Sequence, residues 1–225
     1  MKIFNKVGLK TQRVFVNTFR DRKDAGERLS ALLVHYKKDK SALVLGLARG
    51  GAIVAHEIAK ALLLPLNVIV PRKLGAPNNP ELAIGAVAED GETWLNDELI
   101  AIIGVSPPFI QEEIERQKKI IERRLQLYRK GAGLGDLKGK TVILVDDGIA
   151  TGATMLVEIQ HFRKMGSRIV VAAPVAAREP WLEIQKLADE AICLDVEETF
   201  YGISAFYESF SQVEDEEILS ILQRH

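Results

Sequence analysis

Apolar residues gather in five short runs that are rich in β-branched side chains. These runs are residues 42–47, 66–70, 141–145, 168–173 and 190–194. Between several of them, apolar residues recur at steps of three and four, as do Ala25, Leu29, Leu32, Leu33 and Tyr36. Strands that are apolar on both faces and alternate with helices are typical of a parallel sheet covered on both sides. The pattern therefore predicts an α/β fold with a mostly parallel, five-stranded sheet flanked by helices.

The segment between about residues 82 and 135 departs from this alternation. Residues 82–87 and 93–95 flank a polar turn that contains a glycine, which predicts a β-hairpin. Pro107 then opens a long, highly charged helix that ends near Lys130. We expect the hairpin and the long helix to form an insertion between two core strands.

The same pattern divides the chain into a core and a C-terminal segment. The core covers residues 20–195, with the insertion inside it. Residues 196–225 are expected to form a hood or packing segment that ends in a helix after Asp215. The aromatic side chains of this segment either stack on a ligand or fill a small core. They are Phe200, Tyr201, Phe206 and Tyr207.

Composition and charge narrow the classes of partner. The chain has 225 residues and a formal net charge of −1, so nothing in its overall charge attracts nucleic acid or an anionic membrane. No apolar run is long enough to span a bilayer, and residues 1–6 lack the apolar stretch of a signal peptide. The single cysteine, Cys193, lies in an apolar run and is expected to be buried and reduced. We therefore expect a cytoplasmic protein without a membrane or nucleic-acid partner, and a homodimer remains open.

Residues 142–154 carry the most informative chemistry in the sequence. A buried strand ends in Asp146 and Asp147, and a loop of small residues leads from there into a helix. Successive backbone N–H groups at a helix N-terminus bind phosphate through hydrogen bonds and the helix dipole. Carboxylates accept hydrogen bonds, so the acidic pair suits the vicinal hydroxyls of a sugar. The alternative interpretation is an ordinary strand-to-helix turn in which the aspartates cap the helix.

A second anion site is predicted directly after the first core strand. Arg49 and Gly50 stand in a glycine-rich turn that opens another helix. Arg72 and Lys73 follow the second strand and could bind a diphosphate, although Arg49 could also be an ordinary surface arginine. The polar, breaker-rich residues 74–80 are expected to form a mobile loop. The four histidines have no partner at metal-ligand spacing in the sequence and are expected to be structural or solvated.

Residues 142–154 resemble the motif with which type I phosphoribosyltransferases bind 5-phosphoribosyl-1-pyrophosphate (PRPP). This resemblance implies that Asp146 and Asp147 bind the ribose hydroxyls, act as the catalytic residues and contact Mg²⁺ through water. It also implies a cis peptide bond between Ala48 and Arg49 and a flexible loop near residue 75. The substrate-binding residues it implies are Arg49, Gly50, Arg72, Lys73, Asp146, Asp147, Gly148, Ala150, Thr151, Gly152, Ala153 and Thr154.

The resemblance implies an enzyme of nucleotide metabolism that uses Mg²⁺. It would transfer the 5-phosphoribosyl group of PRPP to a nitrogen acceptor, such as a nucleobase, and release pyrophosphate. In the 6-oxopurine enzymes of the family an aspartate precedes the Thr-Gly of the loop, whereas this chain has Ala150, which disfavours hypoxanthine or guanine as the acceptor. The other function compatible with the motif is a PRPP-binding regulatory protein without transferase turnover. Such a protein usually needs a basic nucleic-acid surface, which the balanced charge disfavours.

Overall fold

The protein is represented by a computed structural model that describes residues 18–224, so the expectation about residues 1–6 lies outside the described range. Its centre is a five-stranded, fully parallel sheet with the strand order β2-β1-β6-β7-β8. The strands are β1 (Ala42–Leu47), β2 (Leu66–Ile69), β6 (Thr141–Val145), β7 (Arg168–Ala177) and β8 (Glu190–Glu197). Each includes most or all of one apolar run of the sequence. The predicted five-stranded α/β fold is therefore confirmed.

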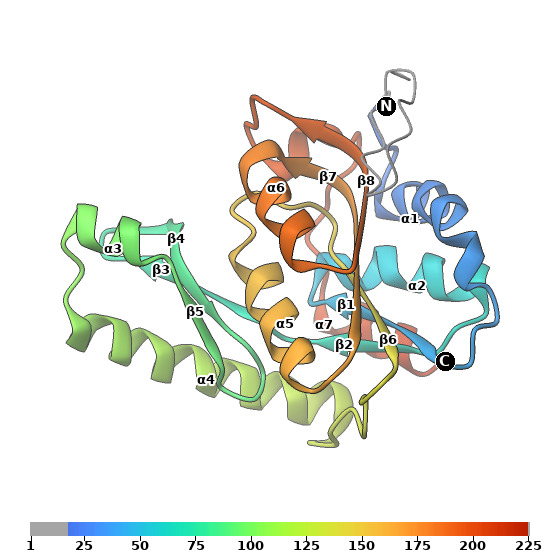
Figure 1. Ribbon diagram of the computed structural model, residues 1–225, viewed down its shortest axis with the longest axis horizontal. Helices are drawn as coiled ribbons and strands as arrows, with labels where there is room; N and C mark the ends of the chain where they lie inside the picture. The colour runs from blue at the N-terminus through green and yellow to red at the C-terminus, as the bar shows by residue number, and fades with distance from the viewer. Residues whose placement is uncertain (1–17, 225) are drawn as a thin grey trace.

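Helices cover both faces of this sheet (Figure 1). Side chains alternate across each strand. In β6, Ile143 and Val145 pack with α1 (Arg22–Ser30) and α2 (Gly50–Leu62). Val142 and Leu144 pack on the other face, with α5 (Ala153–Lys164) and α6 (Arg178–Leu187). The 3-10 helix η1 (Ala31–Tyr36) continues α1. This two-sided burial is the physical reason for the uninterrupted apolar runs.

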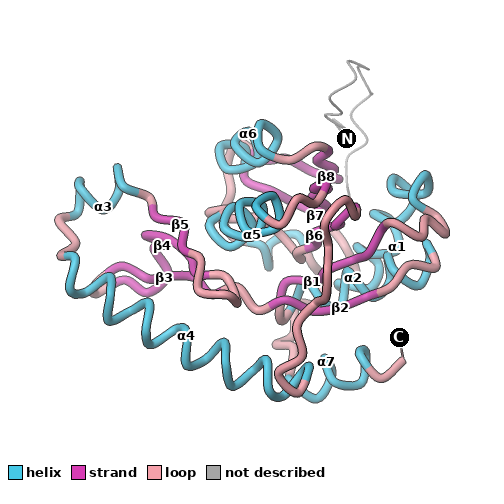
Figure 2. The backbone as a smooth tube through the Cα atoms, turned by 60° about the horizontal axis from the view of Figure 1, so that its bottom comes forward, coloured by secondary structure: helices cyan, strands magenta, loops and turns pink. Residues whose placement is uncertain are grey.

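The insertion forms an arm that extends away from the central sheet (Figures 1 and 2). A second, antiparallel sheet contains the strands β3 (Arg72–Ala76), β4 (Asn79–Val87) and β5 (Thr93–Leu95). The helices α3 (Asp97–Ile103) and α4 (Pro107–Arg129) follow. The predicted hairpin is confirmed as β4 and β5, and the long helix as α4.

The structure corrects the expectation of an irregular loop over residues 74–80. Two of its residues form a tight turn between β3 and β4, in which Asn78 has a φ of 64°, and the others belong to the strands. Leu74 is fully buried and Ala76 nearly so, both within a cluster that includes α4 residues. Burial against the long helix outweighs the local tendency of proline, glycine and asparagine to form a loop. Whether this hairpin moves when a ligand binds stays a prediction.

The C-terminal segment returns to the start of the described chain. It contains the 3-10 helix η2 (Ile203–Phe206) and the helix α7 (Asp215–Leu222). Phe19 bridges to Tyr207 through the backbone, and the two rings lie 5.3 Å apart, centroid to centroid. Ile218 and Ile221 of α7 are buried in the same cluster as residues of α2 and α4. The segment therefore packs both against the core and against the arm.

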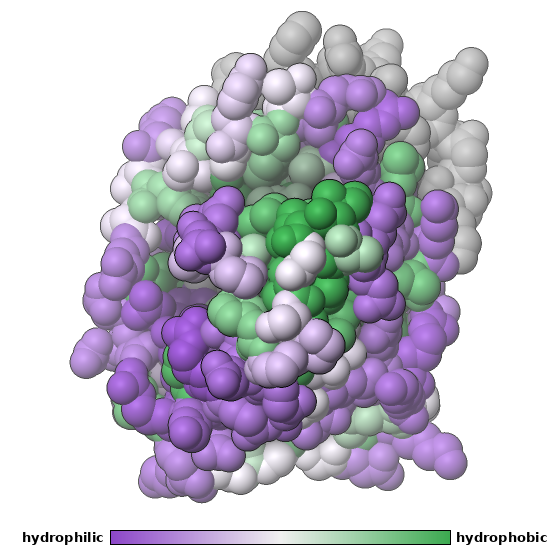
Figure 3. All heavy atoms as spheres, turned by 90° about the vertical axis from the view of Figure 1, so that its left-hand side faces the viewer, coloured by the Kyte–Doolittle hydropathy of each residue, from purple (hydrophilic) through white to green (hydrophobic). Residues whose placement is uncertain are grey.

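The arm also presents apolar side chains to solvent. Ile102 and Ile103 of α3 are 73% and 41% exposed. Viewed from the side of the arm, the surface shows a green apolar area bordered by purple hydrophilic residues (Figure 3). No helix among the described residues is both long enough and apolar enough to cross a membrane.

Candidate active site

The predicted site residues Asp146 and Asp147 directly follow β6. In the parallel pairing of β1 with β6, Gly46 lies opposite Val145. The segments that leave these two strands therefore emerge at the same edge of the sheet, with Arg49 and Gly50 on one and the acidic pair on the other. This confirms that the two predicted anion loops share the carboxyl edge, where α/β sheets bind ligands.

A buried ion pair holds Asp147. The Nε atom of Arg22 donates a hydrogen bond of 2.6 Å to Oδ2 of Asp147, and both side chains are about one-tenth exposed. The same guanidinium donates from Nη1 to the carbonyl oxygen of Ser211 and lies 3.8 Å from the ring centroid of Phe210. Tyr207 donates its hydroxyl to the carbonyl oxygen of Asp147 at 2.6 Å. Residues from both ends of the described chain thus fix this one aspartate.

Asp146 is in a different electrostatic environment from Asp147. Its Oδ1 accepts a hydrogen bond of 2.9 Å from the backbone N–H of Asp147. Burial of the carboxyl group, and next the negative charge of Asp147, raise the pKa of Asp146 well above its usual range. Ionised Asp146 is therefore a source of instability in the folded protein that a bound cation would relieve.

Asp146→Asn is expected to stabilise the folded protein at neutral pH. Folding raises the pKa of Asp146. As the pH rises above about 3.9, Asp146 therefore ionises in the unfolded chain before it ionises in the folded protein. The wild type loses stability from that pH up to the folded-state pKa. Urea unfolding between pH 4 and pH 8 should show an advantage of the variant that grows with pH. Asp39→Asn is the control with the opposite sign, because hydrogen bonds from Ser41 lower the pKa of Asp39. An advantage of Asp146→Asn that is constant over this pH range would contradict the prediction.

The loop after the acidic pair leads into α5 without a side-chain cap. Gly152 precedes the helix with a φ of 75°, a left-handed conformation that favours glycine, and no side chain caps the first turn. Backbone hydrogen bonds join Ile149 to Val175 and Ala177, which anchors the loop to β7. A Cβ atom on Gly148 would lie 2.6 Å from Ile203, so the C-terminal segment packs directly on the loop. The remaining predicted residues, Ala150, Thr151, Ala153 and Thr154, are on this loop and the first turn of α5.

The second loop has the features predicted for it and touches the first. The peptide bond between Ala48 and Arg49 is cis, as expected. The first turn of α2 also lacks a side-chain cap. A Cβ atom on Gly50 would overlap the carboxylate of Asp147, and one on Gly51 would lie 2.6 Å from the carbonyl oxygen of Val145. Only glycines allow this approach, so two helix N-termini converge on the acidic pair.

The predicted cationic side chains of Arg49, Arg72 and Lys73 are spread over a wider area than the acidic pair. Arg49 lies 3.5 Å from Oε2 of Glu214 and 3.9 Å from Oδ1 of Asp215, at the start of α7. Arg72 donates its Nε to Gln117 of α4, and Lys73 binds Glu81. Burial lowers the pKa of Arg72, and the charges of three nearby arginines add to this effect. They are Arg124, Arg116 and Arg49.

A cavity of about 520 Å³ lies between the β3–β4 turn and α4. Arg72 and Lys73 line it, together with Phe109, Glu113 and Arg116. No residue of the loop 148–154 is among those that line it. The structure thus joins Arg49, Gly50 and the loop residues at the carboxyl edge, and places Lys73 on the arm beside this cavity.

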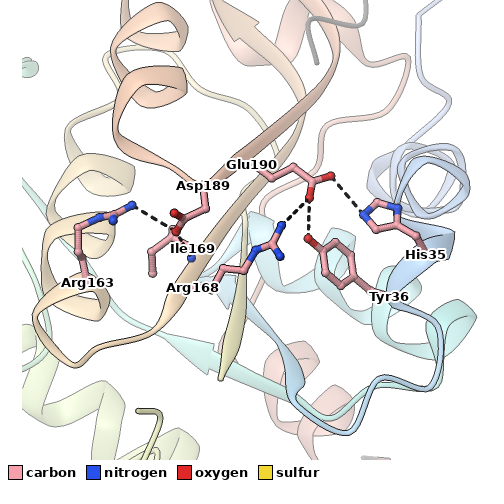
Figure 4. Close-up of polar contacts among 7 residues, drawn as sticks. All are labelled: His35, Tyr36, Arg163, Arg168, Ile169, Asp189 and Glu190. Carbon is pink, nitrogen blue, oxygen red and sulfur yellow. Dashed lines mark hydrogen bonds and ion pairs between the residues drawn. The ribbon is translucent and has the colours of Figure 1, made fainter. Parts of the chain in front are cut away.

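A second acidic pair lies at the opposite edge of the sheet and serves as a comparison for Asp146 and Asp147 (Figure 4). It consists of Asp189 and Glu190. Glu190 accepts a hydrogen bond from Tyr36 and lies within ion-pair distance of His35 and Arg168. Asp189 accepts from the backbone N–H of Ile169. Glu190 thus has protein partners for both carboxylate oxygens. Asp146 and Asp147 have fewer such partners and lie beside two helix N-termini.

The acidic pair also fits the Mg²⁺ ion that the family resemblance implies. Mg²⁺ prefers oxygen ligands and usually keeps several waters. Asp147 uses Oδ2 for Arg22 and Asp146 uses Oδ1 for a backbone N–H, so each carboxylate has a second oxygen. Burial, and next the charge of Asp147, raise the pKa of Asp146, and a bound cation would favour its ionised form.

Sequence reasoning missed the residues that support the site. Arg22, Tyr207 and Ser211 contact Asp147 or its ion-pair partner, and Glu214 and Asp215 contact Arg49. All five lie far in sequence from the residues they support, so no local motif marks them. Arg22 stands three residues before Ala25 and seven before Leu29, so it falls on the apolar face of the first helix, and this spacing could have pointed to an ionic partner.

The chain is similar to known proteins. A model of the phosphoribosyl transferase domain family matches residues 16–210. Proteins from two strains of Mycobacterium tuberculosis, provisionally named phosphoribosyl transferases, are 39% identical over 208 residues, which is 92% of this chain and 46% of each relative. This chain thus spans a little under half their length.

A solved structure covers nearly the same extent as this chain. The crystal structure of TT1426 from Thermus thermophilus is 38% identical and has a TM-score of 0.75, with 92% of this chain and 98% of that chain covered. The family match over most of the chain confirms the resemblance seen in residues 142–154. The chain therefore belongs to the phosphoribosyl transferase domain family.

Proposed function

We propose that this chain binds PRPP together with Mg²⁺ and transfers the 5-phosphoribosyl group to a nitrogen acceptor, releasing pyrophosphate. The observation that carries the proposal is the meeting of two uncapped helix N-termini at the acidic pair, where Gly50 of α2 lies against Asp147. One helix start suits the 5′-phosphate and the other the pyrophosphate. The two carboxylates between them suit the ribose hydroxyls.

In this proposal the protein contributes binding, orientation and charge. The bond between ribose C1 and the pyrophosphate oxygen breaks and that oxygen keeps the electron pair, while the acceptor nitrogen forms the new bond to C1. Positive charge develops on the ribose ring, next to Asp146 and Asp147, and negative charge on the departing pyrophosphate. Arg49 and Arg72 would stabilise that anion, and the charge of Arg49 is near enough to Arg72 to contribute to the lowered pKa of Arg72. Bound Mg²⁺ would supply further neutralisation of the pyrophosphate.

For the acceptor we propose only its chemical class, a nitrogen nucleophile such as a nucleobase. The cavity beside α4 is lined by Phe109, Arg72 and Glu113, a set that offers an aromatic face, donors and acceptors. We therefore propose the arm as the element that presents the acceptor. A role in nucleotide metabolism and in the cytoplasm follows from the same proposal.

The test is a panel of nucleobases and small amines incubated with PRPP and Mg²⁺ and scored by pyrophosphate release. Release that depends on one acceptor supports the transferase. Binding of PRPP by calorimetry without release from any acceptor would instead support the regulatory alternative. Absence of PRPP binding would reject both functions.

Gly152→Val is expected to impair PRPP binding more than Thr154→Ala. Valine is strained at the φ of 75° that Gly152 adopts, and its Cβ atom would lie 2.8 Å from Pro180, so the loop would have to move. Thr154→Ala removes one hydroxyl and should cost about 1–3 kcal/mol of binding free energy. Calorimetric titration with PRPP and Mg²⁺ measures both. A larger loss in Thr154→Ala would show that side chains, not backbone N–H groups, bind the phosphate.

A further inference from the structure

A second cluster of ligand-type side chains lies where the β4–β5 turn meets α5. Asp90 and Glu92 stand on the turn, and His161 is on the helix. One ligand atom from each lies within 4.8 Å of the others, and His161 Nδ1 is 2.9 Å from Oδ2 of Asp90. His161 is buried, Glu92 is half-buried and Asp90 is exposed, so the cluster opens to solvent on one side. This is the arrangement of a small metal site that solvent can reach.

An independent observation at the same place is the side chain of Glu158. It is fully buried, and neither carboxylate oxygen has a hydrogen-bond partner among the described residues. Glu158 is three residues before His161 and therefore shares its helix face, which is the face turned toward the hairpin. A buried carboxylate without a partner is costly unless a cation or a proton neutralises it.

The protein charges around Glu158 are mostly negative. Burial raises the pKa of Glu158 well above its usual range, and the charges of Glu89, Asp90 and Glu92 raise it further. Arg129 is the nearby cation that opposes this effect. Its Nη2 lies 2.6 Å from Oε1 of Glu89, and its buried Nε and Nη1 have no hydrogen-bond partner among the described residues. Lys164 pairs with Glu92 at 2.6 Å, yet its side chain is 72% exposed and can move away. The cluster therefore has more carboxylates than nearby cations.

We propose that Asp90, Glu92 and His161 bind a divalent transition-metal ion such as Zn²⁺, with the buried, unpartnered carboxyl group of Glu158 behind them. Imidazole and carboxylate ligands together suit Zn²⁺ and related ions, whereas Mg²⁺ prefers oxygen ligands alone. The metal takes the place of a proton on Nδ1 of His161, and it displaces Lys164 from Glu92. The site is separate from the acidic pair, because His161 lies two turns along α5 from the phosphate loop.

Such a metal would fasten the hairpin of the arm to the helix that begins at the phosphate loop. Its ligands come from the β4–β5 turn on one side and from α5 on the other. A cation there would hold together two elements that already meet through two ion pairs and through small apolar residues. These are Ala83, Ala86, Ala88, Ala153 and Val157, with Trp94 packed against them. The proposal does not depend on the identity of the substrate.

The experiment uses the full chain, purified without a polyhistidine tag, stripped with chelator and titrated with Zn²⁺ in the absence of PRPP and Mg²⁺. We expect one Zn²⁺ per chain and a thermal midpoint that rises with Zn²⁺. His161→Gln and Asp90→Asn should each weaken binding at least about tenfold, since even an outer partner of a metal site typically contributes about 10- to 100-fold. Asp90 is an exposed turn residue, so its variant should stay folded even if His161→Gln does not.

Two control variants give the experiment its specificity. His35→Gln makes the same exchange in the other histidine–carboxylate pair, in which His35 lies 3.2 Å from Glu190. The single variant Asp146→Asn removes one carboxylate of the acidic pair at the candidate active site and leaves the ion pair of Asp147 with Arg22 intact. Both should bind Zn²⁺ as the wild type does. No saturable Zn²⁺ binding, or wild-type affinity in Asp90→Asn and His161→Gln, would overturn the proposal.

Discussion

Replacing Asp146 and Asp147 together with asparagine is expected to weaken the binding of PRPP and Mg²⁺ by at least about 100-fold. A hydrogen bond to a charged group contributes about 1.5–3 kcal/mol, and each 1.4 kcal/mol corresponds to about a tenfold change in affinity. The variant also leaves Arg22 without its ionic partner, which can destabilise the fold. Calorimetric titration of the variant, after its folding has been verified by circular dichroism, gives the affinity.

The matched control for this variant is Asp189→Asn with Glu190→Gln. It makes the same change in net charge on an acidic pair of the same sheet, at the opposite edge (Figure 4). PRPP affinity should be unchanged in the control. The single variant Asp146→Asn, whose residue makes no ion pair in the described structure, separates loss of ligand contacts from loss of stability. Wild-type affinity in the double variant would refute the ribose role of the pair.

Gly50→Ala is expected to weaken PRPP binding at least about tenfold through a single added methyl group. The new Cβ atom would overlap the carboxylate of Asp147 and lie 2.9 Å from Nε of Arg22. The carboxylate is held at 2.6 Å by that arginine, so it cannot move without weakening the ion pair. Overpacking of this kind costs about 1–3 kcal/mol of folding free energy as well.

Gly133→Ala serves as the control for Gly50→Ala. A Cβ atom on Gly133 meets no described atom within 4 Å, and the residue does not have a positive φ. Its affinity and its unfolding midpoint should both match the wild type. If Gly50→Ala also binds PRPP normally, the α2 loop does not contribute to the ligand site, and the pyrophosphate role of Arg49 and Gly50 fails with it.

The central sheet could be predicted from the sequence because each strand is buried on both faces. Residues 141–145 have no polar position after the first threonine, and the structure places side chains from this strand in two apolar clusters. The strand β3 escaped prediction because its stability comes from α4, which follows it much later in the chain. The glycine, prolines and asparagines of residues 74–80 therefore indicated a loop, whereas packing against α4 stabilises a hairpin there.

The motif residues of the candidate site could be predicted for a similar reason. The acidic pair and the phosphate loop are contiguous in the sequence. Their chemistry depends on the backbone conformation, which the glycines indicate. The contacts that hold them are not contiguous. Arg22 and Tyr207 meet at Asp147 only in the folded chain, and His161 meets Asp90 only when α5 packs on the hairpin. Roles that depend on such long-range contacts need the structure.

The enclosure of Asp147 by the two ends of the chain has a consequence for cooperativity. Arg22, near the start of the described residues, holds the carboxylate of Asp147, and Tyr207, near their end, holds its backbone carbonyl oxygen. The aspartate is therefore correctly placed only when both ends are folded. Partial unfolding of either end would therefore disrupt the site. A ligand bound there should slow hydrogen exchange throughout the central sheet as well as at the loop that it contacts.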